Sequence, residues 1–548
     1  MYAQGRVGYD LLNDRVFKVT PWGTAYSNSF KGGLDELSNR QTYELNVEGF
    51  VGATHKLTKD IGLDAVVGAN LRKNQSEYIS VNGGPFVLPY LYTPSNVVNY
   101  GRGYSFWKTE VQSAYYTLDF SYKNFLTLGT TGRYDKYSTL PESNNSVFTP
   151  SFNAAFIFSE LVDVPQLSFG KLRASYAITS GEPANAYQTA VYYSPGNAIN
   201  GTPTGNFSNS LPNLFLKPFT LSEVEVGTEL KFFGNRLGFD IAYFSRKTKN
   251  EIMPASYSVA TGYTSGVIGT GATENKGIEI LVTGTPVQTK NFTWNVSFNA
   301  TSVNNKIVNT DANNNPIGLG VNRATLGNAQ TFFIPGMSGP QIKAYDYKYD
   351  SKGQIVVDAS GYPLRGDFKT YGSVLPTFYG GLNNEFTYKG VTLSFLIDYN
   401  YGNKIMSATK YYSLFRGLDK ETLNGRDGIT TGVTESGATN TVKADAQGYY
   451  RSLAQRVTGV TVLSGDFIKF RQLTIGYTLG EKVFAKVPAI RSINLSLVGR
   501  NLFIIMKKSD NIDPESNFRA DVRYAGIEGT SLPPVRSFGL NANIKFKK

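Results

Sequence analysis

Apolar and polar residues alternate with a period of two along nearly the whole chain. In the segment 291–303, NFTWNVSFNATSV, the rings of Phe292, Trp294 and Phe298 share one parity, while uncharged polar residues occupy the other. Successive side chains of a β-strand point to opposite faces, so this pattern predicts a strand with one apolar face and one polar face. The sequence contains about 16 such segments.

The connections between these predicted strands are alternately short and long. A soluble β-sandwich has no reason to place every long connection at one end, whereas a bacterial outer-membrane barrel combines short periplasmic turns with long extracellular loops. The sequence therefore predicts an all-β fold, a transmembrane antiparallel β-barrel. Its long extracellular loops are expected at about 181–220, 250–274, 306–374, 403–465 and 507–534.

The composition is that of a strand-rich membrane protein. Only 18% of the residues are charged, against roughly 25% in soluble domains. The 36 Tyr, 35 Phe and 56 Gly residues favour strands and tight turns over helices. We expect no amphipathic helix, and no apolar run approaches the roughly 20 residues that a membrane-spanning helix needs.

A lipid bilayer would give the two faces of each strand different surroundings. Its core offers no water to unpaired backbone groups, so a sheet that crosses it presents apolar side chains to lipid and polar ones to the interior. Lipid-facing positions are expected at Trp294, Phe298, Phe395, Tyr399, Phe538 and Phe546. Lumen-facing polar positions are expected at Asp119, Glu223, Glu225, Asp240, Asn295, Asn299 and Asp398.

Two residue types used by many hydrolases are scarce or missing in the sequence. Cysteine is absent and His55 is the only histidine, which excludes cysteine-based metal sites and histidine-containing catalytic triads. Two lumen carboxylates would suit a glycosidase. A polar lumen lining and contacts with a plug explain these acids without catalysis, so we expect no enzyme, no metal and no cofactor.

The formal charge of +12 admits an anionic partner such as nucleic acid or lipopolysaccharide. The basic residues are scattered rather than gathered in a run, and the polar face holds many acids. We therefore expect outer-membrane lipid and lipopolysaccharide as neighbours and no nucleic acid.

Three aromatic residues are candidates for substrate binding. Trp107, Tyr257 and Tyr263 are expected in outer loops, where they would stack on sugar faces or pack on a peptide. Capping the barrel or contacting a partner would explain the same rings.

Ordered motifs run along the chain: LTLGTTGRYD (126–135), KLRASYAITSG (171–181), TENKGIEI (273–280), LPTFYGGLNNEFTYKGVTLSFLIDYNYGNKI (375–405), SGDFIKFRQLTIGYTL (464–479), INLSLVGRNLFII (493–505), DNIDPES (510–516) and RSFGLNANIKF (536–546). In this order they resemble the SusC/RagA-like TonB-dependent transporters of the Bacteroidetes outer membrane. One departure is Phe219, since family members usually carry a glutamate after the Leu-Lys-Pro found here at 216–218.

The resemblance implies a plug domain that is followed in the sequence by a barrel of about 22 strands. Family members begin with a signal peptide, an extension domain, a TonB-contacting segment and that plug, and this chain shows none of these parts. We therefore expect residues 1–548 to be the C-terminal portion of a longer transporter, with Met1 as an internal start. Its first strand would run from about Gln4 to Lys18.

The function implied by the resemblance is TonB-dependent import of a large nutrient across the bacterial outer membrane. An oligosaccharide or a peptide would be captured between the outer loops and a SusD-like lipoprotein that acts as a lid. TonB would act through a plug and an N-terminal segment outside this chain. A non-transporting receptor or adhesin, and a passive porin, would use the same wall, and the sequence does not define the substrate.

Overall fold

The computed structural model describes residues 1–27, 30–181, 185–190, 193–196, 198–311, 313–319, 328–487, 489–518 and 522–547. The chain forms two compact units. Unit 1 comprises Met1–Ala155, Ser175–Ser222 and Thr248–Gly271, and unit 2 comprises Phe156–Ala174, Glu223–Lys247 and Ala272–Lys548.

Long strands dominate the part of the chain that the structure describes. Sixteen of them have ten or more residues, which confirms the expected number, and the first contains the predicted segment from Gln4 to Lys18. They are β1 (Tyr2–Thr20), β2 (Gly33–Lys56), β3 (Ile61–Phe86), β4 (Val97–Tyr122), β5 (Leu126–Tyr137), β6 (Ser146–Phe156), β7 (Leu167–Gly181), β11 (Phe219–Phe232), β12 (Leu237–Lys249), β14 (Ser265–Gln288), β15 (Phe292–Asn309), β20 (Phe378–Tyr388), β21 (Val391–Tyr401), β24 (Phe467–Leu479), β25 (Ile490–Lys507) and β27 (Ser537–Phe546).

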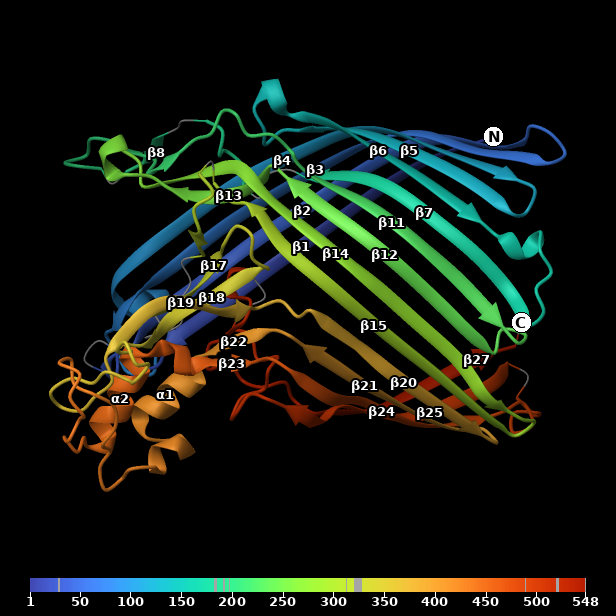
Figure 1. The fold of residues 1–548 in the computed structure, drawn as a ribbon. Coiled ribbons are helices and arrows are strands. Elements are labelled where there is room, and N and C mark those ends of the chain that lie inside the picture. Colours follow the sequence, from blue (N-terminus) through green and yellow to red (C-terminus); the bar gives the residue numbers. More distant parts are fainter. Residues whose placement is uncertain are drawn as a thin grey trace. The chain divides into compact units, whose positions relative to one another are not determined.

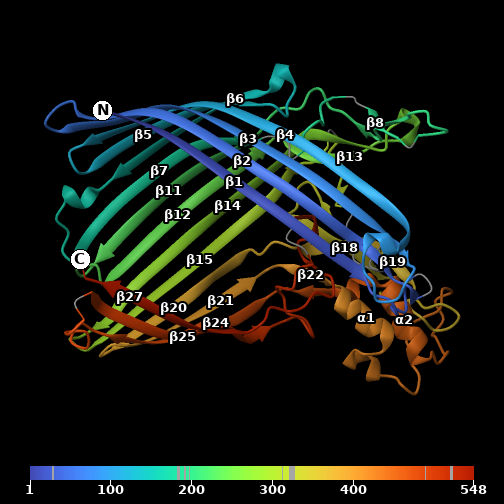
Figure 2. The same ribbon diagram turned by 180° about the vertical axis from the view of Figure 1, so that it is seen from behind.

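Unit 1 is built on an antiparallel meander. Strands β1 to β5 pair in chain order and run side by side over long registers (Figure 2). The register places Val7 opposite Val47 and Val47 opposite Leu71. Residues directly opposite one another point to the same face, so the period-two pattern of each strand merges into an apolar face and a polar face.

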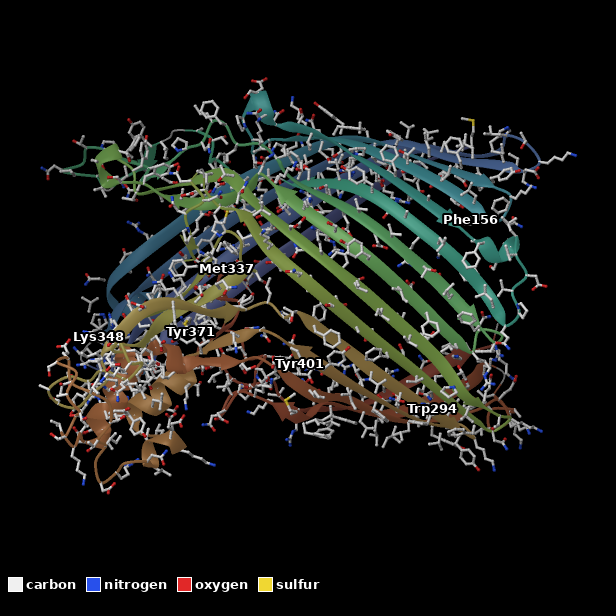
Figure 3. The ribbon with its side chains drawn as sticks, viewed as in Figure 1. Phe156, Trp294, Met337, Lys348, Tyr371 and Tyr401 are labelled. Carbon is white, nitrogen blue, oxygen red and sulfur yellow. The ribbon has the colours of Figure 1, made fainter. Side chains whose placement is uncertain are left out.

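Unit 2 contains a second meander, in which β15, β20, β21, β24, β25 and β27 pair in that order (Figure 1). Its tight turns carry residues with positive φ, Lys389 at 45° and Gly390 at 91°. A left-handed backbone at these two positions lets β20 return directly into β21. Trp294 and Tyr401 lie toward opposite ends of these strands (Figure 3).

The expectation of no amphipathic helix is wrong. Two short helices lie in the long connection after β21: α1 (Ala408–Arg416) and α2 (Ala446–Arg456). Ser407 and Asp445 cap their N-termini by accepting hydrogen bonds from Lys410 and Gly448. With nine and eleven residues, the helices are too short for a clear periodic signal, and their stability comes from packing.

The long connections of unit 2 have their own hydrophobic core. Its fully buried members include Ile342, Met406, Tyr411 and Leu453, and Tyr371 packs against them (Figure 3). The elements that contribute to it are β17 (Ala329–Phe333), β18 (Pro340–Tyr347), β19 (Arg365–Ser373), β22 (Lys404–Ser407), β23 (Val462–Ser464), β26 (Ile527–Glu528) and the two helices. Strand β16 (Ile317–Gly318) pairs with β17. The expected loops 306–374 and 403–465 are therefore largely folded.

Unit 1 has two smaller apolar cores near the ends of its strands. The first core consists of Val111, Tyr137, Leu140 and Leu216, and the second consists of Leu34, Phe86 and Val97. The expected loop 250–274 is shorter than predicted, because strands occupy much of it. The remaining short strands are β8 (Tyr193–Pro195), β9 (Gly205–Phe207), β10 (Ser210–Leu211) and β13 (Glu251–Ser256).

Candidate functional site

The polar face of unit 1 carries a row of side chains across β1 to β5. The register places Arg6 opposite Glu48, Glu48 opposite Asn70, Asn70 opposite Ser113, and Ser113 opposite Asp135. Arg6 Nη1 lies 3.5 Å from Glu48 Oε2, and the Ser113 hydroxyl donates to Asp135 Oδ1 at 2.6 Å. Four members, Arg6, Glu48, Asn70 and Asp135, line an open cavity of about 720 Å³.

Asp119 shares this polar face, on β4 with Ser113. It lies opposite Asp64 in β3 and Gly129 in β5. A Cβ added to Gly129 would come within 2.5 Å of Asp119 Oδ1, so the glycine leaves room for the carboxylate.

The polar face of unit 2 pairs acids on β11 and β12 with arginines. Arg173 Nε donates to Glu225 Oε1 at 3.1 Å, and its Nη1 donates to Asp240 Oδ1 at 2.7 Å. Arg246 Nε donates to Glu223 Oε2 at 2.7 Å. Three of the predicted polar positions therefore lie in ion pairs, in which each carboxylate is oriented by a cation.

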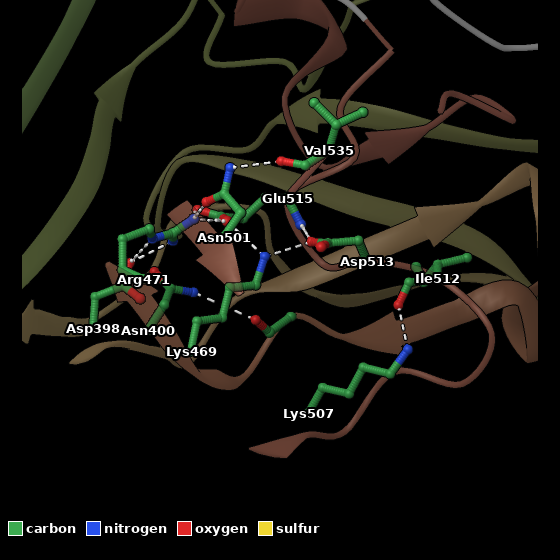
Figure 4. Close-up of polar contacts among 11 residues, drawn as sticks. Asp398, Asn400, Lys469, Arg471, Asn501, Lys507, Ile512, Asp513, Glu515 and Val535 are labelled. Carbon is green, nitrogen blue, oxygen red and sulfur yellow. Dashed lines mark hydrogen bonds and ion pairs between the residues drawn. The ribbon is translucent and has the colours of Figure 1, made fainter. Parts of the chain in front are cut away.

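A second charged cluster links the connection after β25 to the polar face of β21 and β24 through ion pairs, and we call it the loop clamp. It consists of Asp398 in β21, Lys469 and Arg471 in β24, and Asp513 and Glu515 in the segment after β25 (Figure 4). Arg471 donates to Glu515 through Nη1 at 2.9 Å and Nη2 at 3.0 Å. Lys469 Nζ lies 2.6 Å from both Asp513 Oδ1 and Glu515 Oε2.

The Arg471 guanidinium also donates hydrogen bonds to Asp398. Arg471 Nε donates to Asp398 Oδ2 at 2.9 Å, and Nη2 contacts the same oxygen. Asn299, Asp398 and Glu515 line an open cavity of about 430 Å³, together with Tyr399. The structure thus brings two predicted lumen residues to one place.

The electrostatics of the loop clamp predict a dependence on pH. Burial raises the pKa of Glu515, but hydrogen bonds from Arg471 and Lys469 outweigh burial and hold this pKa below the usual glutamate range. A lowered folded-state pKa stabilises the fold above the unfolded value of about 4.3, and this contribution is lost as the pH falls through the folded value. We therefore expect amide hydrogen exchange in 508–518 to stay slow at pH 7 and 5 and to accelerate below about pH 4, after correction for intrinsic rates.

The control for this experiment is Glu515→Gln, which removes the titrating group. In this variant the exchange in 508–518 should be the same at pH 5 as at pH 3.5. Equal protection of the unmodified segment at both pH values would contradict the role given to Glu515.

The opposite face of the unit 2 strands carries a row of aromatic rings. Trp294 stacks on Phe386 with ring centres 5.6 Å apart, Phe395 stacks on Phe470 at 5.8 Å, and Phe470 stacks on Phe503 at 4.9 Å. Each such pair contributes about 0.5–1.5 kcal/mol beyond its buried area. The ring centres of Phe386 and Phe395 are 6.2 Å apart, so the row of rings connects five neighbouring strands on one face.

The other apolar positions named from the sequence lie on the same set of strands. Phe298 stacks on Tyr399 with ring centres 6.2 Å apart, and the Tyr399 hydroxyl donates to the backbone oxygen of Asn299 at 3.1 Å. On β27, Phe538 and Phe546 are exposed. Asn295, on the polar side, accepts a hydrogen bond from Thr285 at 3.0 Å.

Two negative findings concern the described residues alone. They include no group of three or more His, Cys, Asp or Glu side chains arranged to hold a metal ion. None of their helices combines the length and apolar character needed to cross a membrane.

The family model described as "TonB dependent receptor-like, beta-barrel" matches residues 2–384. The chain belongs to this family. Such receptors lie in the outer membrane, so this TonB-dependent receptor is located in the bacterial outer membrane.

The receptor is similar in sequence to several other TonB-dependent receptors. TonB-dependent receptor P3 of Formosa agariphila is 24% identical over 507 residues, which cover 86% of this chain and 48% of the relative. TonB-dependent receptor SusC of Bacteroides thetaiotaomicron is 24% identical over 469 residues, covering 78% and 43%. The receptor spans about half the length of the curated relatives it matches.

Solved structures share the fold of the receptor. The structure of the RagAB peptide transporter matches with a TM-score of 0.78 at 18% identity, over 99% of this chain and 60% of that one. The match of fold and family agrees with the antiparallel β-barrel that the sequence predicts.

The three aromatic candidates of the receptor have different positions. The placement of Trp107 in a loop is wrong: it lies within β4, opposite Ser76 in β3. The strand continues beyond the pairing with β5, which the sequence does not indicate. Tyr257 and Tyr263 do lie in the connection between β13 and β14, where the Tyr263 ring is 5.4 Å from Phe207.

Sequence reasoning identified the acids of the receptor's polar face but not their basic partners. Arg173, Arg246, Lys469 and Arg471 occupy strands that the alternation predicts, and their parity alone places them among polar side chains. A search for bases on strands that neighbour acid-bearing strands would have found Arg173 and Arg246. The partners of Lys469 lie more than 40 residues away, and no local pattern indicates them.

Proposed function

We propose that the receptor imports a large nutrient, an oligosaccharide or a peptide, across the outer membrane in a TonB-dependent manner. The observation that carries this proposal is the division of the strands into a face of paired charges and a face of exposed apolar side chains. In a barrel wall, the charged face lines the passage and the apolar face contacts lipid.

This orientation gives each residue named above a side of the barrel wall. Asp119, Glu223, Glu225, Asp240, Asn295, Asn299 and Asp398 line the lumen, and Trp294, Phe298, Phe395, Tyr399, Phe538 and Phe546 face lipid. The long connections then lie outside the cell, with Tyr257 and Tyr263 among the residues that meet the substrate. The ion pairs of Glu223, Glu225 and Asp240 support a structural role for these acids rather than acid–base catalysis, so the receptor makes and breaks no bonds.

A surface lipoprotein of the SusD type completes the proposed importer as a lid over the outer connections. Support comes from the similarity to SusC and to the RagAB peptide transporter. TonB would act through a plug, the part that opens the passage in response to inner-membrane energy.

Growth on defined nutrients tests the proposal. Deleting the gene is expected to abolish growth on either a panel of neutral and acidic oligosaccharides or a protein hydrolysate, with no effect on growth on monosaccharides or free amino acids. Depleting TonB should give the same phenotype. Uptake that persists without TonB would identify a passive porin, and surface binding without uptake would identify a receptor or adhesin. A tagged receptor that never co-purifies with a lipoprotein would refute the lid.

A further inference from the structure

A compact pocket lies between the two helices of unit 2. Its wall is made by the last turn of α1, the following segment through residue 426, and the first half of α2. The volume is about 440 Å³, enough for one or two sugar or amino-acid units. The floor is rigid, because Leu414, Thr422 and Tyr450 are buried and the Tyr450 hydroxyl donates to the Glu421 backbone oxygen at 2.7 Å. Figure 1 shows both helices within the long connection that follows β21 and β22.

Three arginines line this pocket: Arg416, Arg426 and Arg451. The guanidinium groups of Arg416 and Arg451 lie over the Phe415 ring, 5.3 and 4.8 Å from its centre. Arg426 Nε donates to the Thr422 backbone oxygen at 2.6 Å. Ring and backbone contacts thus position three cations around one hollow without neutralising any of them.

The nearby acids are engaged elsewhere. Asp419 and Glu421 each accept a hydrogen bond from Lys410 Nζ at 3.0 Å. Asp445 accepts from the Gly448 amide at 2.7 Å and the Tyr362 hydroxyl at 2.5 Å. Asp427 follows Arg426 in sequence but does not line the pocket. Among the described lining residues there is therefore positive charge and no carboxylate.

We propose that this arginine pocket binds a carboxylate group carried by the substrate, such as a uronic acid unit or the C-terminus of a peptide. The planar guanidinium fork matches the two oxygens of a carboxylate, and three arginines lining one pocket attract an anion. The pocket thereby narrows the imported nutrient to oligomers that carry a carboxylate. That statement about the nutrient rests on the proposed function, whereas binding to the pocket does not.

Isothermal titration with the full chain in detergent tests the proposal. The probes are tetragalacturonate with its fully methyl-esterified form, and tetraalanine with its C-terminal amide. We expect at least one carboxylate form to bind and its neutral counterpart to bind tenfold more weakly or not at all. The double variant R416Q/R451Q should lose at least tenfold in affinity for the carboxylate form. The control variant R491Q removes an exposed arginine of β25, outside the pocket, and should bind like the unmodified chain.

Comparison of the two carboxylates identifies the source of the group. Equal binding of charged and neutral forms, no binding of either acid, or unchanged affinity in R416Q/R451Q would overturn the proposal. Binding of lipopolysaccharide that depends on Arg416 and Arg451, with no binding of either acid, would also overturn it, because the pocket would then hold a lipid headgroup. Circular dichroism and thermal unfolding check that the double variant is folded. Binding is measured without a membrane or TonB, so its failure leaves the import experiment unaffected.

Discussion

Replacing Arg471 with alanine is expected to detach the segment 508–518 from the strand face and to lower the free energy of unfolding by about 2–3 kcal/mol. The change removes the cation between Asp398 and Glu515, whose side chains are 26% and 35% exposed. Leaving a buried carboxylate unpaired costs about 3–5 kcal/mol, and partial access of water reduces this value. Urea unfolding of the folded receptor in detergent measures the loss, and protease cleavage within 508–518 reports the detachment.

The matched control is Lys348→Ala, which breaks a pair with Glu435 in the same unit. Those two side chains are 47% and 65% exposed, and an exposed pair contributes about 0–1 kcal/mol. The variant Arg471→Lys keeps the charge but loses the fork, so it should fall between Arg471→Ala and the unmodified chain. Similar losses for Arg471→Ala and Lys348→Ala would contradict the structural role of the loop clamp.

The strands could be predicted from the sequence because their signal is local. Each strand alternates apolar and polar residues over its own length, and short turns join it to the next. The alternation extends over most of β15 (Phe292–Asn309) and all of β27 (Ser537–Phe546). The ordered motifs indicated the family, and the matching family model covers most of the long strands.

The long connections could not be predicted in the same way, because their structure depends on distant contacts. Helix α1 buries Tyr411 and Leu414 against α2 and β26, which follow it by tens of residues or more. Short helices take their stability from such packing, so their own sequences carry little signal. The arginine pocket lies in these connections, and the loop clamp joins one of them to β21 and β24. The alternation therefore indicates the acids of the strand faces, Asp398 among them, but neither the pocket nor the partners of Asp398 in the clamp.

One exception on a strand face also follows from tertiary contact. Asn384 in β20 lies opposite Val296 and Phe395, on the apolar face, where alternation predicts an apolar residue. It is buried, and its Oδ1 accepts a hydrogen bond from Trp294 Nε1 at 3.1 Å. A polar group on this face is tolerated because the indole both shields it and satisfies it.

Replacing Leu497 with arginine is expected to destabilise the receptor in lipid strongly. Leu497 belongs to a row in which Leu393, Ile475, Leu497 and Leu540 lie opposite one another across β21, β24, β25 and β27. Their exposed fractions are 37%, 48%, 63% and 74%, so the row is an uncovered apolar surface. If lipid covers it, an arginine there destabilises the barrel by about 2–4 kcal/mol near the bilayer midplane. Folding titrations into lipid vesicles measure this difference directly.

The control for this change is Asn541→Arg, on the polar parity of β27 and opposite Ser496. It adds the same side chain to the same pair of strands, but in the proposed orientation it faces the aqueous passage, where its charge stays hydrated. We expect less than about 1 kcal/mol of destabilisation for this variant. In detergent micelles the two variants should differ less than in vesicles, because a micelle thins easily around a charge. An equal effect of Leu497→Arg and Asn541→Arg in vesicles would mean that the apolar row does not face lipid, and the orientation assigned to every strand would have to be reversed or abandoned.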